Sequence, residues 1–363
     1  MLAAQEKKFL HAILQSGAEL DTIEKLRAAF PSYENAWRAS SAALEQAGLN
    51  AERANHIARA RDRVRPDEEL RKLVGFGIAL VAAEDDEFPH ELRQLAHPPA
   101  ALYIKGRITP GKPRIAVIGT RKATPYGLEA TRKIVRDLAD IADVAIVSGL
   151  ARGIDGAAHR AALESSIETV GVLGGGLDRT SFYPAEHWDM AEQIIRKGGA
   201  VISEYPPASR PLKHHFRARN RLIAGLVRVV VVAEAPERSG TLITVNYALE
   251  QGRDVFAIPG TLFSAASAGN NRLIQEGAAL LRSAEELVDA LGISKRAAPP
   301  SSAGALTDAT QRTILELLSE PQSVDELCRT TELPPAAVIS CLSMLELKGY
   351  VRGMGQNRFQ RVA

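Results

Sequence analysis

The most constraining feature of this sequence is a repeated alternation between short β-branched runs and helical stretches, which extends from residue 114 to residue 260. Each run ends at a glycine or a polar residue, and a stretch with helical spacing follows it. The runs are residues 114–120, 144–149, 169–176, 200–204, 228–234 and 254–260. This alternation predicts an α/β fold with a mainly parallel sheet and helices on both faces. In that architecture ligands bind at the carboxyl ends of the strands, so the residues after each run are the candidates for function.

The segments on either side of this alternation have different patterns. Residues 1–87 show apolar positions at helical spacing and are predicted to form a small N-terminal helical, SAM-like domain. Residues 88–293 contain the alternation and are predicted to form an extended Rossmann-like domain. Residues 294–305 are rich in Pro, Ser, Ala and Gly, which is typical of a linker. Residues 306–363 have the pattern of three short helices and a β-hairpin, and this combination predicts a winged helix-turn-helix.

Composition is that of a globular protein, with 45% hydrophobic and 24% charged residues, and it argues against a disordered or fibrous chain. We expect a cytoplasmic protein, because the sequence has neither a membrane-spanning apolar run nor a signal-peptide pattern at its N-terminus. The net charge is only +2. Positive charge is nevertheless concentrated between Glu204 and Glu234, where the sequence has no acidic residue. The basic residues of this stretch are Arg210, Lys213, Arg217, Arg219, Arg221 and Arg228.

The densest part of this charge surrounds one aromatic residue, Phe216. In a helix that begins near Phe216, Arg217 and Arg221 share one face, and Arg219 and Asn220 share another with the ring. Such a surface suits a single-stranded nucleic acid, because guanidinium groups contact phosphates while bases stack on the ring. The alternative is a core phenylalanine beside a solvated helix face. The lack of acidic residues favours the binding surface, since a solvated face usually mixes both signs.

Three turns at strand ends are candidates for phosphate contacts through backbone amides, because each leads into a helix N-terminus. They are Gly119 with Thr120, Ser148 with Gly149, and Ser239 with Gly240. The guanidinium of Arg121 directly follows the first turn and could join it. The alternative is that these residues only form tight turns and cap the helices, and the sequence leaves both readings open.

Other motifs that could carry chemistry favour structural roles. Asp155 and His159 are four residues apart on a predicted helix, and a structural hydrogen-bonded pair is favoured over acid–base catalysis. The glycines at 174–176 lack the third glycine of a dinucleotide-binding turn, so we interpret them as a place where another backbone or a nucleotide approaches closely. His214 and His215 make a poor metal site without a nearby carboxylate. We therefore expect no metal, no cofactor and no catalytic residue.

Seven ordered blocks together resemble the DNA-processing protein A (DprA/Smf) family, over a stretch from about Phe88 to Leu291. They include VIGTR, SGLARGIDGAAHRAAL, GVLGGGLDRTSFYP and KHHFRARNRLIAGL. By number, the blocks are residues 88–106, 117–121, 148–163, 171–184, 213–226, 239–260 and 267–278.

The resemblance implies a protein that binds single-stranded DNA without catalysis, protects incoming DNA and helps to load RecA recombinase. It would act in the natural transformation of competent cells or in recombination. It also implies a homodimer formed through the Rossmann-like domain, with single-strand-binding protein as a further candidate partner. The strand-binding pocket of the family falls here on Arg121, Lys213, Phe216, Asn220 and Arg221. To these we add Arg219 because of its charge and position.

Two segments depart from what a DNA-contacting domain needs. The N-terminal QSGAELDTIEKL does not reproduce a glycine-rich helix-hairpin-helix turn, so we expect no DNA contact there. The predicted recognition helix of the winged helix carries Lys348 as its only cation, which favours a protein-docking or regulatory role. The chief alternative for the whole chain is a nucleotide-processing enzyme of the phosphoribohydrolase type, which would require a committed acid–base or cofactor site.

Overall fold

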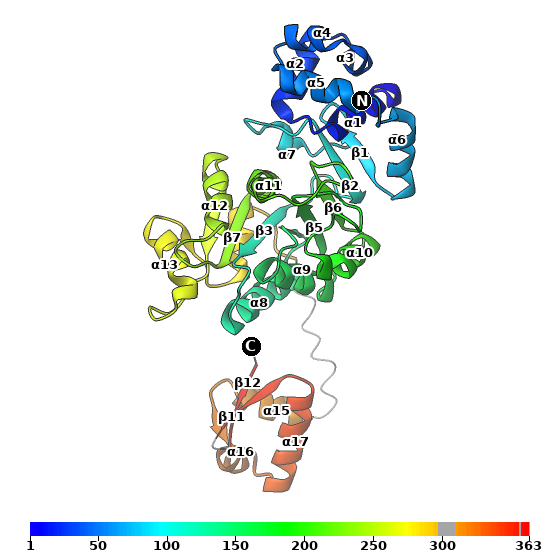
Figure 1. Cartoon of the computed structure of the whole chain (residues 1–363). Helices are drawn as coiled ribbons and strands as arrows, with labels where there is room; N and C mark the ends of the chain where they lie inside the picture. Colours follow the sequence, from blue (N-terminus) through cyan, green and yellow to red (C-terminus); the bar gives the residue numbers. More distant parts are fainter. Residues whose placement is uncertain (297–308, 356, 363) are drawn as a thin grey trace. The chain divides into compact units, whose positions relative to one another are not determined.

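The computed structural model describes residues 1–296, 309–355 and 357–362 of the chain (Figure 1). The chain divides into two compact units, residues 1–296 and residues 297–363. Most of the predicted linker, residues 294–305, lies outside the described residues. In the described part of the chain, every helix is too short or too polar to cross a lipid bilayer.

Within residues 1–296, the strands form one nine-stranded sheet with the order β1-β2-β6-β5-β4-β3-β7-β8-β9. The strands from β6 to β9 in this order pair in parallel, whereas β1 and β2 are paired antiparallel at one edge. The predicted mainly parallel, Rossmann-like sheet is therefore confirmed. The β-branched runs form its centre, because strands covered on both faces need apolar side chains at successive positions. The strands are β1 (Ala79–Ala82), β2 (Ala101–Gly106), β3 (Arg114–Gly119), β4 (Ala145–Ser148), β5 (Glu168–Leu173), β6 (Ala200–Ser203), β7 (Val229–Glu234), β8 (Asp254–Ala257) and β9 (Ala279–Leu280).

Helices cover both faces of this sheet. On one face, Val117 of β3 packs in a buried cluster with side chains of α8 (Pro125–Ile141), α9 (Ile154–Glu164) and α14 (Ala284–Leu291). On the other face, Val230 of β7 lies in a cluster with α7 (His90–Arg93), α11 (Lys213–Gly225), α12 (Thr241–Glu250) and α13 (Ala268–Gln275). The remaining helices of this part are η1 (Ala185–His187), α10 (Trp188–Arg196) and η2 (Ala265–Ser267).

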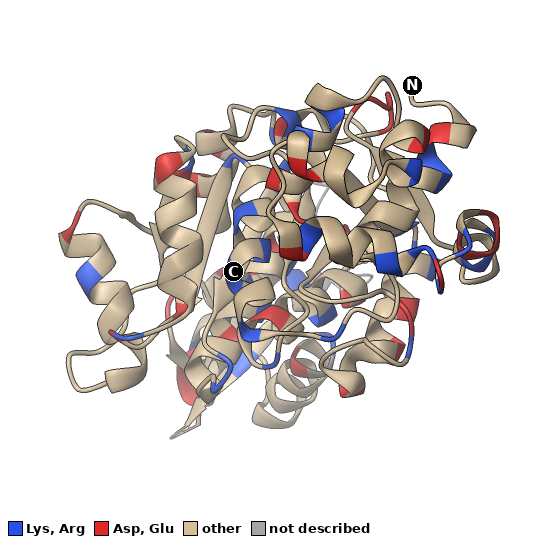
Figure 2. Ribbon diagram, turned by 45° about the horizontal axis from the view of Figure 1, so that its top comes forward, with Lys and Arg blue, Asp and Glu red and all other residues tan. Residues whose placement is uncertain are grey.

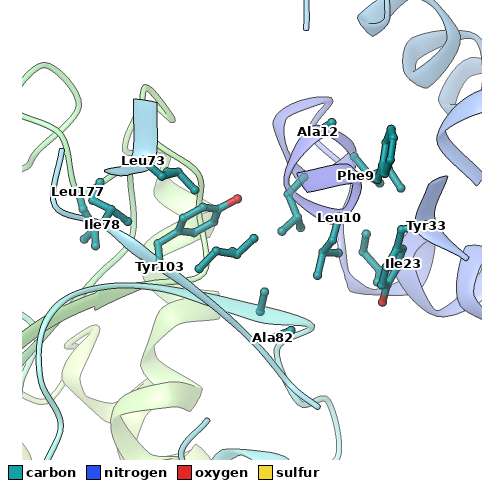
Figure 3. Close-up of a cluster of buried hydrophobic side chains, with 14 of the residues drawn as sticks. Phe9, Leu10, Ala12, Ile23, Tyr33, Leu73, Ile78, Ala82, Tyr103 and Leu177 are labelled. Carbon is teal, nitrogen blue, oxygen red and sulfur yellow. The ribbon is translucent and has the colours of Figure 1, made fainter. Parts of the chain in front are cut away.

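The N-terminal helices pack against the antiparallel edge of the sheet. Phe9 and Leu10 share a buried cluster with Tyr103 of β2, whose hydroxyl lies on the side of the helices (Figure 3). His11 is fully buried, and its Nδ1 lies 2.8 Å from the Tyr103 hydroxyl oxygen. Strand β1 lies within the predicted N-terminal domain, residues 1–87, but it pairs with β2 in the sheet. The predicted domain boundary between residues 87 and 88 stays a prediction. The helices are α1 (Ala4–Gln15), α2 (Leu20–Ala29), α3 (Tyr33–Arg38), α4 (Ser41–Gln46), α5 (Ala51–Ala60) and α6 (Pro66–Gly75).

The C-terminal unit is a winged helix, as its sequence pattern predicts. Three helices enclose a small core that includes Leu318, Leu327 and Leu345, and the strands described here form a three-stranded sheet. A capping box between Ser323 and Glu326 starts its second helix. The elements are α15 (Ala309–Leu317), β10 (Gln322–Ser323), α16 (Val324–Thr331), α17 (Pro335–Leu347), β11 (Val351–Gly355) and β12 (Arg358–Arg361).

Candidate functional site

A cavity of about 370 Å³ opens where the carboxyl ends of β3 and β7 meet helices α11 and α12. Strand β3 lies between β4 and β7, so successive crossovers leave it in opposite directions. Such a switch point is where an open α/β sheet leaves a crevice for a ligand. The lining residues are Ile118, Gly119, Thr120, Arg121, Ala151, Asp155, Lys213, Phe216, Arg217, Arg219, Asn220, Ile223, Ser239, Gly240, Thr241, Ile243 and Thr244.

The first two turns of α11 supply one wall of this cavity. Lys213, Phe216, Arg217 and Asn220 lie three or four residues apart, which places them along one side of the helix. Lys213 and Arg217 are exposed, whereas Phe216 and Asn220 are partly buried. The structure thus places the predicted residues Lys213, Phe216 and Asn220 together at the cavity. It also places Arg217 there, which is absent from the predicted site.

Three of the basic residues at the cavity have no acidic partner in the part of the chain that the structure describes. Basic and acidic residues are interspersed over much of the molecule (Figure 2). Among the described residues, however, none of the carboxylates forms an ion pair with Arg121, Lys213 or Arg217. An anionic ligand is the natural counter-charge for these three side chains.

Arg121 and Phe216 form the centre of the site. The guanidinium carbon of Arg121 lies 5.1 Å from the centroid of the Phe216 ring, a cation–π contact. The ring is partly exposed and lines the cavity, so the alternative of a core phenylalanine does not describe it. Guanidinium and ring together offer a charged group and a flat apolar surface at one point.

The loop that carries Arg121 is fixed by Glu234 at the end of β7. This glutamate is fully buried, and its carboxylate accepts hydrogen bonds from the Thr124 amide at 2.7 Å and the Thr124 hydroxyl at 2.6 Å. Its carbonyl oxygen accepts from the Thr120 amide, also at 2.7 Å. Thr124 in turn caps α8, so one residue of β7 holds the turn after β3 in place.

Arg219, which is predicted as a DNA contact, lines the cavity but is mostly engaged within the protein. It is only 4% exposed, and its guanidinium donates to the carbonyl oxygens of Gly149, at 2.8 Å, and Val172. Burial lowers the pKa of Arg219 to about 10, so the group keeps its charge at neutral pH. The nearby Asp155, whose pKa burial raises, compensates that charge inside the protein. Arg219 therefore supports the floor of the cavity by joining the ends of β4 and β5.

Arg221, also predicted as a DNA contact, is paired with a carboxylate in this structure. Its side chain is 14% exposed and forms an ion pair with Glu204, which follows β6 and is 16% exposed. Burial raises the pKa of Glu204, whereas Arg221 opposes that change. Arg221 does not line the cavity, and its guanidinium is held by Glu204 instead. The predicted shared face of Arg217 and Arg221 does not form a single cationic surface.

The three predicted phosphate turns differ in what they leave available. The amides of Thr120 and Gly149 are occupied by the Glu234 carbonyl and the Asp155 carboxylate, and the hydroxyl of buried Ser148 donates to the Val117 carbonyl. A Cβ at Gly149 would lie 2.5 Å from the Arg219 guanidinium, so a side chain does not fit there. Gly240, by contrast, is exposed at the start of α12 beside the cavity, and it is the turn that retains room for an anion.

Asp155 and His159 do not bond to each other. Asp155 accepts from the Gly149 amide at 3.0 Å, while His159 Nδ1 lies 2.7 Å from the Thr169 hydroxyl. Burial lowers the pKa of His159 to about 3, so it is neutral at physiological pH. Both side chains are thus engaged within the fold, and the predicted hydrogen bond between them is replaced by bonds to other partners.

The glycines at 174–176 and the neighbouring pair His214 and His215 lie at the start of α11 and help to hold it in place. A Cβ at Gly174 would lie 3.2 Å from the backbone of His215, so the glycine permits the close backbone approach that the sequence predicts. His215 stacks on Tyr205 with 3.9 Å between ring centroids, and His214 packs edge-on against it. Both histidines thus pack as rings beside the helix start.

Two residues next to the cavity are absent from the set predicted from sequence. Tyr183 lies with its ring centroid 5.7 Å from that of Phe216, and Arg152 lies over the Tyr183 ring at 5.8 Å. Both occur in blocks that carry the family resemblance, but they are about 30 residues apart along the chain. Neither periodicity nor charge clustering signals that they meet.

Two family models match the chain. The model described as DNA recombination-mediator protein A matches residues 79–292, and the DprA winged helix domain matches residues 296–357. The first match contains every residue of the cavity.

Curated proteins and solved structures of similar sequence agree with these matches. The putative DNA processing protein DprA of Mycobacterium tuberculosis (strain H37Rv) is 39% identical over 82% of this chain and 81% of its own length. The DNA processing protein DprA of Streptococcus pneumoniae is 44% identical over 61% of this chain and 75% of its own length. The X-ray structure of the latter protein superposes with a TM-score of 0.66 and 35% identity, covering 78% of this chain and 97% of that structure. A structure of DNA processing protein A from Helicobacter pylori, described for its single-stranded DNA binding mode, has a TM-score of 0.51 and 31% identity over 58% of this chain and 95% of its own.

Proposed function

Because this chain belongs to the DNA recombination-mediator protein A family, we propose that it binds single-stranded DNA in the cavity between β3, β7 and α11. One observation carries the proposal: the accessible ring of Phe216 lies under the guanidinium of Arg121, with Lys213 and Arg217 beside it, and neither of these two cations has an ion-pair partner among the described residues. The single-stranded DNA binding mode described for the Helicobacter pylori relative supports the same class of ligand.

The chemistry of the cavity suits a single strand better than a duplex. Stacking on Phe216 requires an unpaired base with a free face, whereas bases in a duplex are already stacked on their neighbours. Phosphates of the same strand reach Arg121, Lys213 and Arg217, and each such contact releases counterions from the strand. Every base has a stacking face, so we expect little sequence preference.

We also propose that the chain performs no chemistry on the DNA. Asp155 and His159, which are the acid–base candidates of the sequence, are buried and engaged in hydrogen bonds within the fold. On family membership alone, we propose further that the chain forms a homodimer through its Rossmann-like domain and delivers the strand to RecA, with single-strand-binding protein as an additional partner. Its place in natural transformation or recombination is proposed on the same basis.

A paired assay tests the proposal against the enzyme alternative. Binding of labelled oligothymidine is measured beside binding of a duplex of the same length, and nucleotide hydrolysis is measured on the same preparation. We expect tight binding of the single strand, weaker binding of the duplex and no turnover of nucleotides. Equal affinity for both DNAs at moderate salt would contradict the proposal, and steady nucleotide hydrolysis would establish the enzyme instead.

A further inference from the structure

A second hollow adjoins the cavity and contains another exposed aromatic ring. Its lining includes Arg121, Arg152, Tyr183 and Phe216, and it shares Arg121 and Phe216 with the larger cavity. The two hollows therefore lie on either side of shared residues. Tyr183 is 38% exposed, an unusual degree for a tyrosine that serves only to fill a core.

Four flat groups follow one another across these hollows. Arg121 lies over Phe216, Phe216 adjoins Tyr183, and Arg152 lies over Tyr183, with distances between 5.1 and 5.8 Å. Guanidinium planes and aromatic rings are the two kinds of side chain on which unpaired bases stack. These four side chains together offer more stacking surface than a single base requires.

The geometry of the two rings decides how many bases they can hold. Their centroids are 5.7 Å apart, and their planes are inclined by 59°. A base held between two rings needs parallel planes about 7 Å apart, which is two stacking distances of about 3.4 Å. The rings are too close and too inclined to hold one base between them, so each ring is left to bind a base of its own.

From this arrangement we propose that Tyr183 is a second base-stacking position, so that the strand continues from Phe216 onto Tyr183 and Arg152. The inference rests on the proposed function and names a further contact residue of the same site. Arg152 is held by Glu186, but both side chains are about half exposed. Because water screens such a pair, Arg152 can exchange this carboxylate for a phosphate of the bound strand.

The test compares Tyr183→Leu, which removes the ring, with Tyr183→Phe, which keeps it. For oligothymidine, we expect Tyr183→Leu to weaken binding about 5- to 100-fold, which corresponds to the loss of one stacked base. Tyr183→Phe should bind within about twofold of the parent protein. The logarithmic salt dependence should be unchanged in both, because an uncharged side chain releases no counterions.

An abasic oligonucleotide of the same length separates stacking from a general structural effect. It retains the phosphates but offers no base, so the parent protein and Tyr183→Leu should bind it equally. A variant that loses affinity for both DNAs in the same proportion would overturn the proposal, since damage to the fold weakens every contact. Normal affinity of Tyr183→Leu for oligothymidine would also overturn it.

A third variant, Tyr183→Trp, reports on stacking directly even if the leucine variant folds poorly. Its fluorescence should be quenched by oligothymidine beyond the change seen in the parent protein, which already contains Trp37 and Trp188. No additional quenching on a saturated complex would contradict the proposal. If instead the parent protein fails to bind oligothymidine at all, the proposed function itself falls, so the two failures are distinguishable.

Discussion

At the scale of single residues, the charged side chains of α11 divide into two groups according to what the fold places beside them. Lys213 and Arg217 line the cavity and form no ion pair with any acidic residue that the structure describes. Arg219 and Arg221, by contrast, are compensated by Asp155 and Glu204. The first group can contribute counterion release on binding a strand. The second group is already committed to the protein, and removing either arginine would leave a buried carboxylate uncompensated.

The sequence predicts this helix and its charge but not the division. Spacing along a helix shows which residues share a face, for example Arg217 and Arg221, but not which partner approaches that face. Glu204 follows β6 and Asp155 lies in the first turn of α9, and both reach α11 only through the strand order of the sheet. For the same reason the contact between Tyr183 and Phe216 could not be predicted from either local motif.

Replacing Phe216 with alanine distinguishes stacking from packing. We expect affinity for oligothymidine to fall by about 1 to 3 kcal/mol while the salt dependence stays unchanged, because the ring binds a base without releasing counterions. Thermal unfolding of the same variant is the control. A loss of about 3 to 5 kcal/mol of stability would instead identify the ring as part of the core.

At the scale of elements, the β-branched runs of the central domain predict their strands well, because a strand buried on both faces is apolar throughout. The antiparallel edge strands β1 and β2 cannot be predicted from the sequence in the same way. Strand β1 has four residues and alternates between buried and less buried positions, and its pairing partner β2 lies across a proline-rich segment. Their role as a platform for α1 depends on tertiary packing that a local pattern does not contain.

The contact between α1 and β2 makes stability depend on pH. Burial lowers the pKa of His11 to about 4 from an ordinary 6.5, so the unfolded chain takes up a proton in this range before the folded protein does. The stability contributed by neutral His11 is therefore complete above pH 6.5 and is lost as the pH falls toward 4.

We expect His11→Gln to lose less stability than the parent protein between pH 7 and pH 5, by up to about 2 kcal/mol. Urea unfolding of both proteins at the two pH values measures this difference. His159, whose pKa is lowered in the same direction, is retained in both and cancels from the comparison. An identical loss in the two proteins would show that His11 does not titrate in this window.

At the scale of the whole molecule, the residues proposed to bind DNA all lie in the unit formed by residues 1–296, and the winged helix is a separate unit. The second unit's helix α17 exposes Ile339 and Met344 rather than a row of basic side chains. Exposed apolar side chains on a helix suit contact with a protein better than contact with phosphates. These exposed side chains agree with the predicted docking or regulatory role of the winged helix, which stays a prediction.

Deletion of residues 300–363 tests this division of labour. We expect the remaining chain to bind oligothymidine within about tenfold of the full protein, a difference of at most about 1.4 kcal/mol. The melting temperature of the shortened chain shows whether the first unit stays folded. A larger loss of affinity in a folded chain would locate part of the DNA site in the winged helix.

The most direct test of single-strand binding in this cavity is the salt dependence of oligothymidine affinity in Arg121→Ala, Lys213→Ala and a control variant, Arg71→Ala. Arg71 is an exposed arginine of α6 with the same charge but a position outside the cavity. If Arg121 and Lys213 contact phosphates, each substitution weakens binding and lowers the logarithmic salt slope by about 0.7, whereas Arg71→Ala leaves both values unchanged. Equal slopes in all three variants and the parent protein would contradict the placement of the strand in this cavity.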